Sequence, residues 1–204
     1  MFKRFLAVLL LGLAALAAQA EGNYRVLKNP RPLDNPALIE VREFFWYGCP
    51  HCYRLEPHLA RWLKTRPADV RFIRTPAALN PLWEANSRGY YAVEMMGMTE
   101  KTHGPLFHAI HDKRQKLFDQ ASLADFYARL GVNPAQFNAN YNSFHVSGMV
   151  ARSRQLAQAY GLEGVPAVVV NGKYVVSGEG PEVIATLNLL IGKERAAKSA
   201  RKTK

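Results

Sequence analysis

The residues best suited to chemistry are Cys49 and Cys52, the only two cysteines of the 204-residue chain, in the tetrad Cys49-Pro50-His51-Cys52. A disulfide between them would close a very small ring and restrain the unfolded chain little. A bridge that adds so little stability is better explained as a reactive one. The spacing therefore indicates thiol–disulfide exchange.

The tetrad is expected where a strand meets a helix. The segment 38–47 (LIEVREFFWY) ends in an aromatic run, which is typical of a strand entering a buried sheet. Pro50 suits the first helical position, where a missing N–H costs nothing. An apolar stripe at helical spacing then predicts a helix from Pro50 to about Thr65, with Cys52, Leu55, Leu59, Trp62 and Leu63 facing inward.

This placement makes the two sulfurs unequal. At an exposed helix start, unpaired N–H groups and the helix dipole stabilise a thiolate on Cys49, and His51 adds a donor or a positive charge. Cys52, one turn inward, is expected to be buried and less reactive. A stable thiolate is a good leaving group and stabilises the reduced dithiol, so the pair is expected to be strongly oxidising.

The N-terminus carries an export signal. Lys3 and Arg4 precede the apolar run 5–18, and Ala18-Gln19-Ala20 suits a signal peptidase. The alternative, a membrane anchor, needs about 20 apolar residues, more than this run has. We therefore expect residues 1–20 to be a signal peptide removed after Ala20.

The net charge of the chain is +11, and basic residues gather at its C-terminus. The stretch 193–204 has Glu194 as its acid and no apolar periodicity, so it predicts a basic disordered tail. A nucleic-acid surface needs basic residues with stacking aromatics on folded structure, so no nucleic-acid partner is expected.

The tetrad does not have the pattern of a metal site or of a haem attachment site. Zinc would need two ligands besides the cysteines, and no second Cys-x-x-Cys or paired histidine motif has regular spacing. Haem attachment requires histidine after the second cysteine, where Tyr53 stands. No metal and no cofactor is therefore expected. Three helical-region histidines are interpreted as ordinary surface or core residues: His103, His108 and His111.

The remaining pattern predicts an α/β protein. A strand at 70–74 should run parallel to the first, and helices should follow through the insertion 80–145 and again over 146–160. Asn171-Gly172 predicts a hairpin between two short strands, and Gly180-Pro181-Glu182 opens a last helix ending near Gly192. This is a thioredoxin fold with an inserted helical subdomain, its two parts at 21–79 and 146–192.

The segments around the cysteine tetrad and around the predicted hairpin resemble those of a known family. The segment 43–53 (EFFWYGCPHCY), with 164–167 (GVPA) and 170–174 (VNGKY) far downstream, resembles the DsbA family of thiol:disulfide interchange proteins. The likeness covers essentially the whole chain after the signal. Trp46-Tyr47-Gly48 departs from the enterobacterial pattern, which puts the shape of the partner-binding surface in question but not the chemistry.

The resemblance implies roles for further residues. Pro166 should be cis and lie against the redox site, with Val165 offering backbone groups to an extended substrate, although trans proline is the default from sequence alone. Glu43 would be an acid beneath the disulfide that exchanges protons with Cys52, the alternative being a solvated carboxylate paired with Arg42 or Arg74. Glu56 matches a second family acid, more weakly.

The function expected from the resemblance is a periplasmic dithiol oxidase acting on unfolded or reduced exported proteins. It would be reoxidised by a DsbB-like inner-membrane protein that passes electrons to quinone, and we expect a monomer. Two alternatives stay open: an isomerase or reductase, and a peptide-binding chaperone in which Cys49 is incidental.

Overall fold

The computed structural model describes residues 23–202, so the expected signal peptide, 1–20, lies outside the described residues. A five-stranded sheet in the order β1-β5-β4-β2-β3 forms the centre. Its strands are β1 (Tyr24–Val26), β2 (Ile39–Phe45), β3 (Val70–Pro76), β4 (Ala167–Val170) and β5 (Tyr174–Ser177). The short edge strand β1 is not predicted by the sequence pattern.

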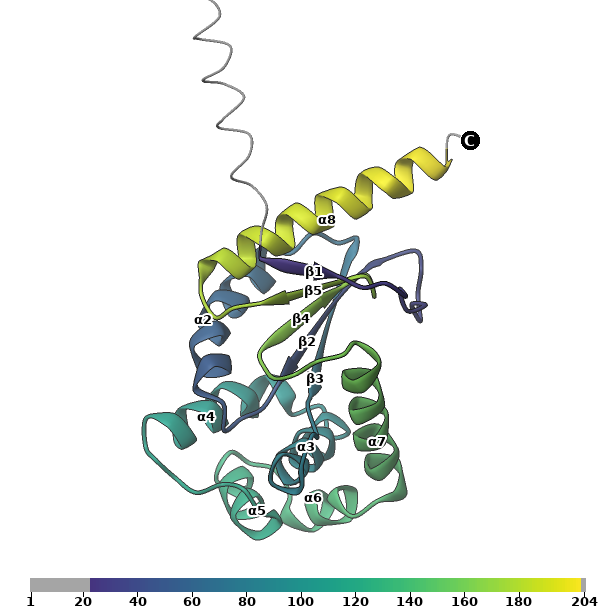
Figure 1. Cartoon of the computed structure of the whole chain (residues 1–204). Coiled ribbons are helices and arrows are strands. Elements are labelled where there is room, and N and C mark those ends of the chain that lie inside the picture. The colour runs from purple at the N-terminus through teal and green to yellow at the C-terminus, as the bar shows by residue number, and fades with distance from the viewer. Residues whose placement is uncertain (1–22, 203–204) are drawn as a thin grey trace, which may run out of the picture.

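Helices cover both faces of this sheet and one of its ends. In Figure 1, α2 (Pro50–Thr65) and α8 lie on one side, α7 (Phe144–Ala159) lies on the other, and a group of helices gathers below. That group contains α3 (Pro81–Glu94), α4 (Thr99–His111), α5 (Gln120–Arg129) and α6 (Pro134–Tyr141). None of the helices within residues 23–202 is long and apolar enough to cross a membrane.

Strand β2 lies between β4 and β3, and every one of its residues is buried. It pairs parallel to β3, as the helical crossover predicts, and antiparallel to β4. Side chains alternate between faces along a strand. Ile39 and Val41 pack with α2 and α8, whereas Phe44 packs with α7. Glu43 therefore falls in the row of Ile39 and Val41, beneath the redox helix.

The predicted hairpin and redox helix are confirmed. β4 and β5 pair antiparallel around Asn171 and Gly172, whose φ angles are 52° and 64°. Two consecutive positive φ angles define the turn that Asn-Gly favours. Helix α2 runs from Pro50 to Thr65, as its apolar spacing indicates.

The prediction for the C-terminus is wrong. Helix α8 runs from Pro181 to Lys202 and does not end near Gly192, so no disordered tail begins at residue 193. The buried stripe of this helix continues into a charged residue, Glu194, which bonds Lys173 and Tyr174. Arg195 also pairs with Asp69. Beyond Gly192, where the apolar periodicity stops, ion pairs with residues far away in the sequence stabilise α8.

Candidate active site

Cys49 is the N-cap of α2, at the junction of strand and helix. The backbone N–H of Cys52 donates to Cys49 Sγ at 3.4 Å. The pKa of Cys49 is lowered to about 6, first by its side-chain hydrogen bond with Cys52 and then by the backbone N–H groups and the charge of His51, which together outweigh burial. The helix start thus acts on this sulfur as the sequence indicates.

The helix start at Cys49 is expected from the sequence to be exposed, but Cys49 is buried. Only 6% of its surface is accessible to solvent. The loop before β4 covers it, and Cys49 Sγ lies 3.3 Å from the Val165 carbonyl oxygen, which accepts a hydrogen bond from the sulfur when Cys49 is protonated. Val165–Pro166 is a cis peptide bond, as the resemblance implies. The reactive sulfur is therefore enclosed by a segment more than a hundred residues away in sequence.

Cys52 differs sharply from its neighbour. It is fully buried, and burial is the largest of the causes that raise its pKa, followed by its hydrogen bond with Cys49. Both thiols are free in the structure. One sulfur is thus a thiolate near neutral pH while the other keeps its proton.

The three residues before Cys49 hold the active-site loop against the helical subdomain. A Cβ on Gly48 would lie 2.3 Å from the Trp46 ring, so only glycine leaves room for that indole. The Trp46 ring stacks on Trp83, with centroids 4.8 Å apart, and its Nε1 donates to Asn86. The departure from the enterobacterial pattern is therefore a packed contact between the loop and α3.

An exposed group of charges, the surface cluster, lies beside Cys49. It consists of His51, Arg54 and Glu179. His51 Nδ1 is 2.5 Å from Glu179 Oε2, and Arg54 donates to the same oxygen at 2.8 Å. These contacts join the first turns of α2 to the loop before α8. Arg54 also lies close enough to Cys49 for the thiolate to raise its pKa, after the larger effect of Glu179.

Glu43 is 1% exposed, which excludes the solvated alternative. Arg74, its register partner on β3, approaches with Nε 3.5 Å from Glu43 Oε2. Neither carboxyl oxygen has a hydrogen-bond partner among the described residues. Burial first, and the charge of Glu56 second, raise the pKa of Glu43 to about 8 against the opposing effect of Arg74. Glu43 therefore holds a proton at neutral pH.

Glu43 belongs to a buried group of side chains, the inner cluster, that includes Glu56, Arg74, His103 and Tyr47. Arg74 donates to Glu56 at 2.7 Å, and His103 Nε2 lies 3.2 Å from the other Glu56 oxygen. Burial opposes ionisation of Glu56, but His103 and Arg74 outweigh it, so its pKa is lowered. The cluster thus contains one ionised and one protonated carboxyl.

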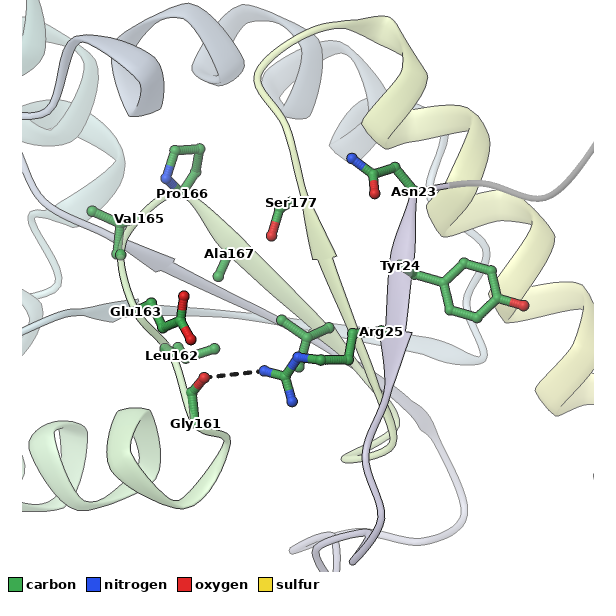
Figure 2. Close-up of a pocket in the computed structure, with 12 residues that line it drawn as sticks. Asn23, Tyr24, Arg25, Gly161, Leu162, Glu163, Val165, Pro166, Ala167 and Ser177 are labelled. Carbon is green, nitrogen blue, oxygen red and sulfur yellow. Dashed lines mark hydrogen bonds between the residues drawn. The ribbon is translucent and has the colours of Figure 1, made fainter.

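Val165 and Pro166 also border a surface cavity of about 470 Å³. Figure 2 shows this cavity between the loop 161–166, the strand β1 and Ser177 of β5. Arg25 reaches across and donates to the Gly161 carbonyl at 3.1 Å. The loop that covers Cys49 therefore has an open face toward the edge of the sheet.

The sequence pattern indicates Cys49, Pro50, His51, Cys52 and Glu43, but other members of the site lie outside it. The sequence alone suggests Arg74 only as a partner for a solvated Glu43, and His103 only as an ordinary histidine. A signal for Arg74 exists, because parallel pairing of the two predicted strands can align it with Glu43. No local signal identifies His103, Arg54 or Glu179.

Comparisons with known proteins agree with this geometry. The model of the DSBA-like thioredoxin domain family matches residues 40–187. The thiol:disulfide interchange protein DsbA of Pseudomonas aeruginosa is 42% identical over 194 residues, 91% of this chain and 92% of that relative. Its crystal structure matches with a TM-score of 0.82, over 87% of this chain and 95% of that one. An oxidoreductase DsbA from Xylella fastidiosa matches with a TM-score of 0.80 at 34% identity, over 85% and 96%.

Proposed function

Since this chain belongs to the DSBA-like thioredoxin domain family, we propose that Cys49 and Cys52 form the disulfide that it donates to exported proteins in the periplasm. The protein is a thiol:disulfide oxidoreductase, as its DsbA relatives are named. The observation that carries the proposal is the asymmetry of the two sulfurs, with the pKa of Cys49 lowered to about 6 and that of Cys52 raised. Such a pair favours the reduced form and so gives its disulfide away.

The exchange begins at Cys49. A client thiolate attacks Cys49 Sγ, the Cys49–Cys52 bond breaks, and Cys52 leaves as a thiolate that takes a proton from Glu43. The client's second thiolate then attacks the client's first sulfur, which is bonded to Cys49 in the mixed disulfide. This forms the client's disulfide and releases Cys49 as a thiolate. Two electrons pass from two client thiols to the enzyme, which ends as a dithiol.

The client is held by backbone as well as by sulfur. Val165 offers its main chain to an extended client segment next to Cys49, and Pro166 shapes the loop that presents it. The cavity beside this loop has room for residues flanking the client's cysteine. Recognition through the main chain suits unfolded or reduced proteins of many sequences.

The proposed activity requires export of the protein to the periplasm and reoxidation of its dithiol after each exchange. Residues 1–20 act as the export signal that delivers the chain to the periplasm. The reduced dithiol passes its two electrons to a DsbB-like inner-membrane protein and on to quinone. The enzyme works as a monomer, because one chain carries both sulfurs and the client-binding loop.

The test is the reduction potential of Cys49/Cys52 in glutathione buffers. An oxidase should lie clearly above about −270 mV, the value of a reducing thioredoxin. A potential at or below that value contradicts the proposal. The double variant Cys49→Ser, Cys52→Ser is the second arm: we expect it to lose all oxidation of a reduced client, and undiminished client folding by it would favour a chaperone.

A further inference from the structure

His103 is a buried histidine of α4 for which the proposed exchange has no use. It is 4% exposed, and its side chain reaches beneath the redox site to meet groups from two other segments. Tyr47 Oη lies 2.8 Å from Nδ1, and Glu56 Oε2 lies 3.2 Å from Nε2. The rings of Phe45 and Phe107 enclose the imidazole, with centroids 5.1 and 5.2 Å away.

The Tyr47 contact fits donation in either direction, so burial of the imidazole decides its protonation state. The Tyr47 hydroxyl can donate to Nδ1 only if that nitrogen carries no proton, and Nε2 must then carry the proton that faces the Glu56 carboxylate. Burial is the largest cause that lowers the pKa of His103 and, together with the charge of Arg74, outweighs the opposing effect of Glu56. The neutral tautomer with its proton on Nε2 therefore accepts a hydrogen bond from Tyr47 and places Nε2 3.2 Å from Glu56 Oε2, a polar contact without hydrogen-bond geometry.

The charges that face His103 come from several elements. Glu56 lies on α2, Arg74 on β3 and Glu43 on β2, while Tyr47 precedes α2. Two further groups, Glu100 of α4 and Tyr90 of α3, lie near the cluster; Glu100 is exposed and approaches Arg74 at 3.9 Å. With Glu43 protonated and Glu56 ionised, the inner cluster carries one positive and one negative charge.

Glu43 and Glu56 compete for one proton because Arg74 is the cation between them. Arg74 contacts both, at 3.5 Å from Glu43 and 2.7 Å from Glu56. Arg74 and His103 both approach Glu56, whereas Glu43 has only the longer contact with Arg74 among the described residues. The ion thus forms at Glu56, and the proton stays at Glu43.

We propose that His103 is a positioning residue that assigns the shared proton of the inner cluster to Glu43, next to Cys52, and keeps it from Glu56. This rests on the proposed function, in which Glu43 protonates the leaving Cys52 sulfur. Glu43 is near enough for its charge to act on Cys52.

The first test removes the imidazole. In reduced His103→Leu at neutral pH, carboxyl-carbon NMR should find Glu56 protonated and Glu43 ionised, with assignments from Glu43→Gln and Glu56→Gln. The rate at which dithiothreitol reduces the disulfide form should fall about tenfold, because the leaving thiolate loses its acid. A proton that stays on Glu43 in this variant overturns the proposal.

Two control variants separate positioning from packing. His103→Gln keeps one donor and one acceptor, so it should restore the proton to Glu43 and most of the rate. His111→Leu removes another α4 histidine, which lies 2.8 Å from the Tyr47 carbonyl. It should leave both carboxyls as in the wild type, and a shift of the proton there would contradict the assignment to His103.

The wild-type protein supplies a test that needs no variant. Nitrogen NMR of reduced protein at neutral pH should find His103 neutral with its proton on Nε2, and an imidazolium or the Nδ1 tautomer would overturn the proposal. These NMR results do not depend on turnover. If the reduction potential refuted the oxidase function, the position of the proton would still be decided separately.

Discussion

The surface cluster beside Cys49 and the inner cluster beneath Cys52 use the same kinds of side chain in opposite surroundings. His51, Arg54 and Glu179 are largely open to water. Glu43, Glu56, Arg74 and His103 are buried or nearly so. Water screens the first group, whereas burial makes the charge state of each member of the second depend on its neighbours.

The two sulfurs obtain their pKa values from different surroundings. His51 is the last of the causes that lower the pKa of Cys49, after hydrogen bonds at the helix start. Burial leads the causes for Cys52. The surface cluster therefore makes a small change to the pKa of a Cys49 thiolate that the helix start already stabilises. The inner cluster controls whether a proton is available for Cys52.

The largest effect is expected when the inner cluster loses its cation. Arg74→Met leaves the ionised Glu56 buried without its guanidinium, which should destabilise the fold by roughly 3–5 kcal/mol. Urea unfolding at neutral pH measures this loss. Arg54→Met, the matched change in the surface cluster, should leave stability close to that of the wild type, and equal losses in the two variants would contradict the comparison.

A second effect concerns pH. The pKa of Glu43 in the folded protein is about 8, above its ordinary value of 4.5. Folding therefore takes up a proton between these values, so stability falls as pH rises from about 4.5 to about 8. Glu43→Gln removes this loss and should be the more stable protein at pH 8 by roughly 2–4 kcal/mol, with no such advantage near pH 4.

The matched control for this prediction is Glu179→Gln. The pKa of Glu179 is lowered, first by its hydrogen bond with Arg54, so its contribution has the opposite sign and is lost as pH falls. Urea melts of both variants across this pH range decide the matter. A Glu43→Gln advantage that does not grow with pH would argue against a protonated Glu43.

The smallest effect is expected at the surface cluster itself. Because the pKa of Cys49 is lowered to about 6 in the folded protein, the reduced form gains stability that is complete above the ordinary thiol pKa. That gain declines with falling pH and is lost below about 6. At pH 7 the reduced form should exceed the oxidised form by about 1 kcal/mol, since the short disulfide ring adds little.

His51→Ser should narrow this gap by only part of that amount, because the helix start remains. Urea melts of both redox forms of the wild type and the variant, from acid to neutral pH, measure the difference. An oxidised form that is the more stable at neutral pH would contradict the whole account of Cys49. A gap that closes completely in His51→Ser would mean that the surface cluster, and not the helix start, sets the pKa.

The elements that could be predicted are those defined by near neighbours along the chain. Proline at the first helical position and an apolar stripe locate α2, and Asn171-Gly172 locates the hairpin. Strand β1 could not be predicted because three residues are too few for a recognisable pattern. The last turns of α8 could not be predicted because ion pairs, such as Arg195 with Asp69, replace apolar residues there.

The reactive pair and its place at a helix start could be identified from the sequence, because each depends on residues within a few positions of one another. The family resemblance needed only short motifs, although these lie far apart along the chain. The groups that surround the two sulfurs are set by tertiary contacts. His51 meets Glu179 across 128 positions, and Tyr47 meets His103 across 56. Burial and charge are properties of such distant contacts, so the protonation of Glu43 and the covering of Cys49 by Val165 could emerge only from the folded chain.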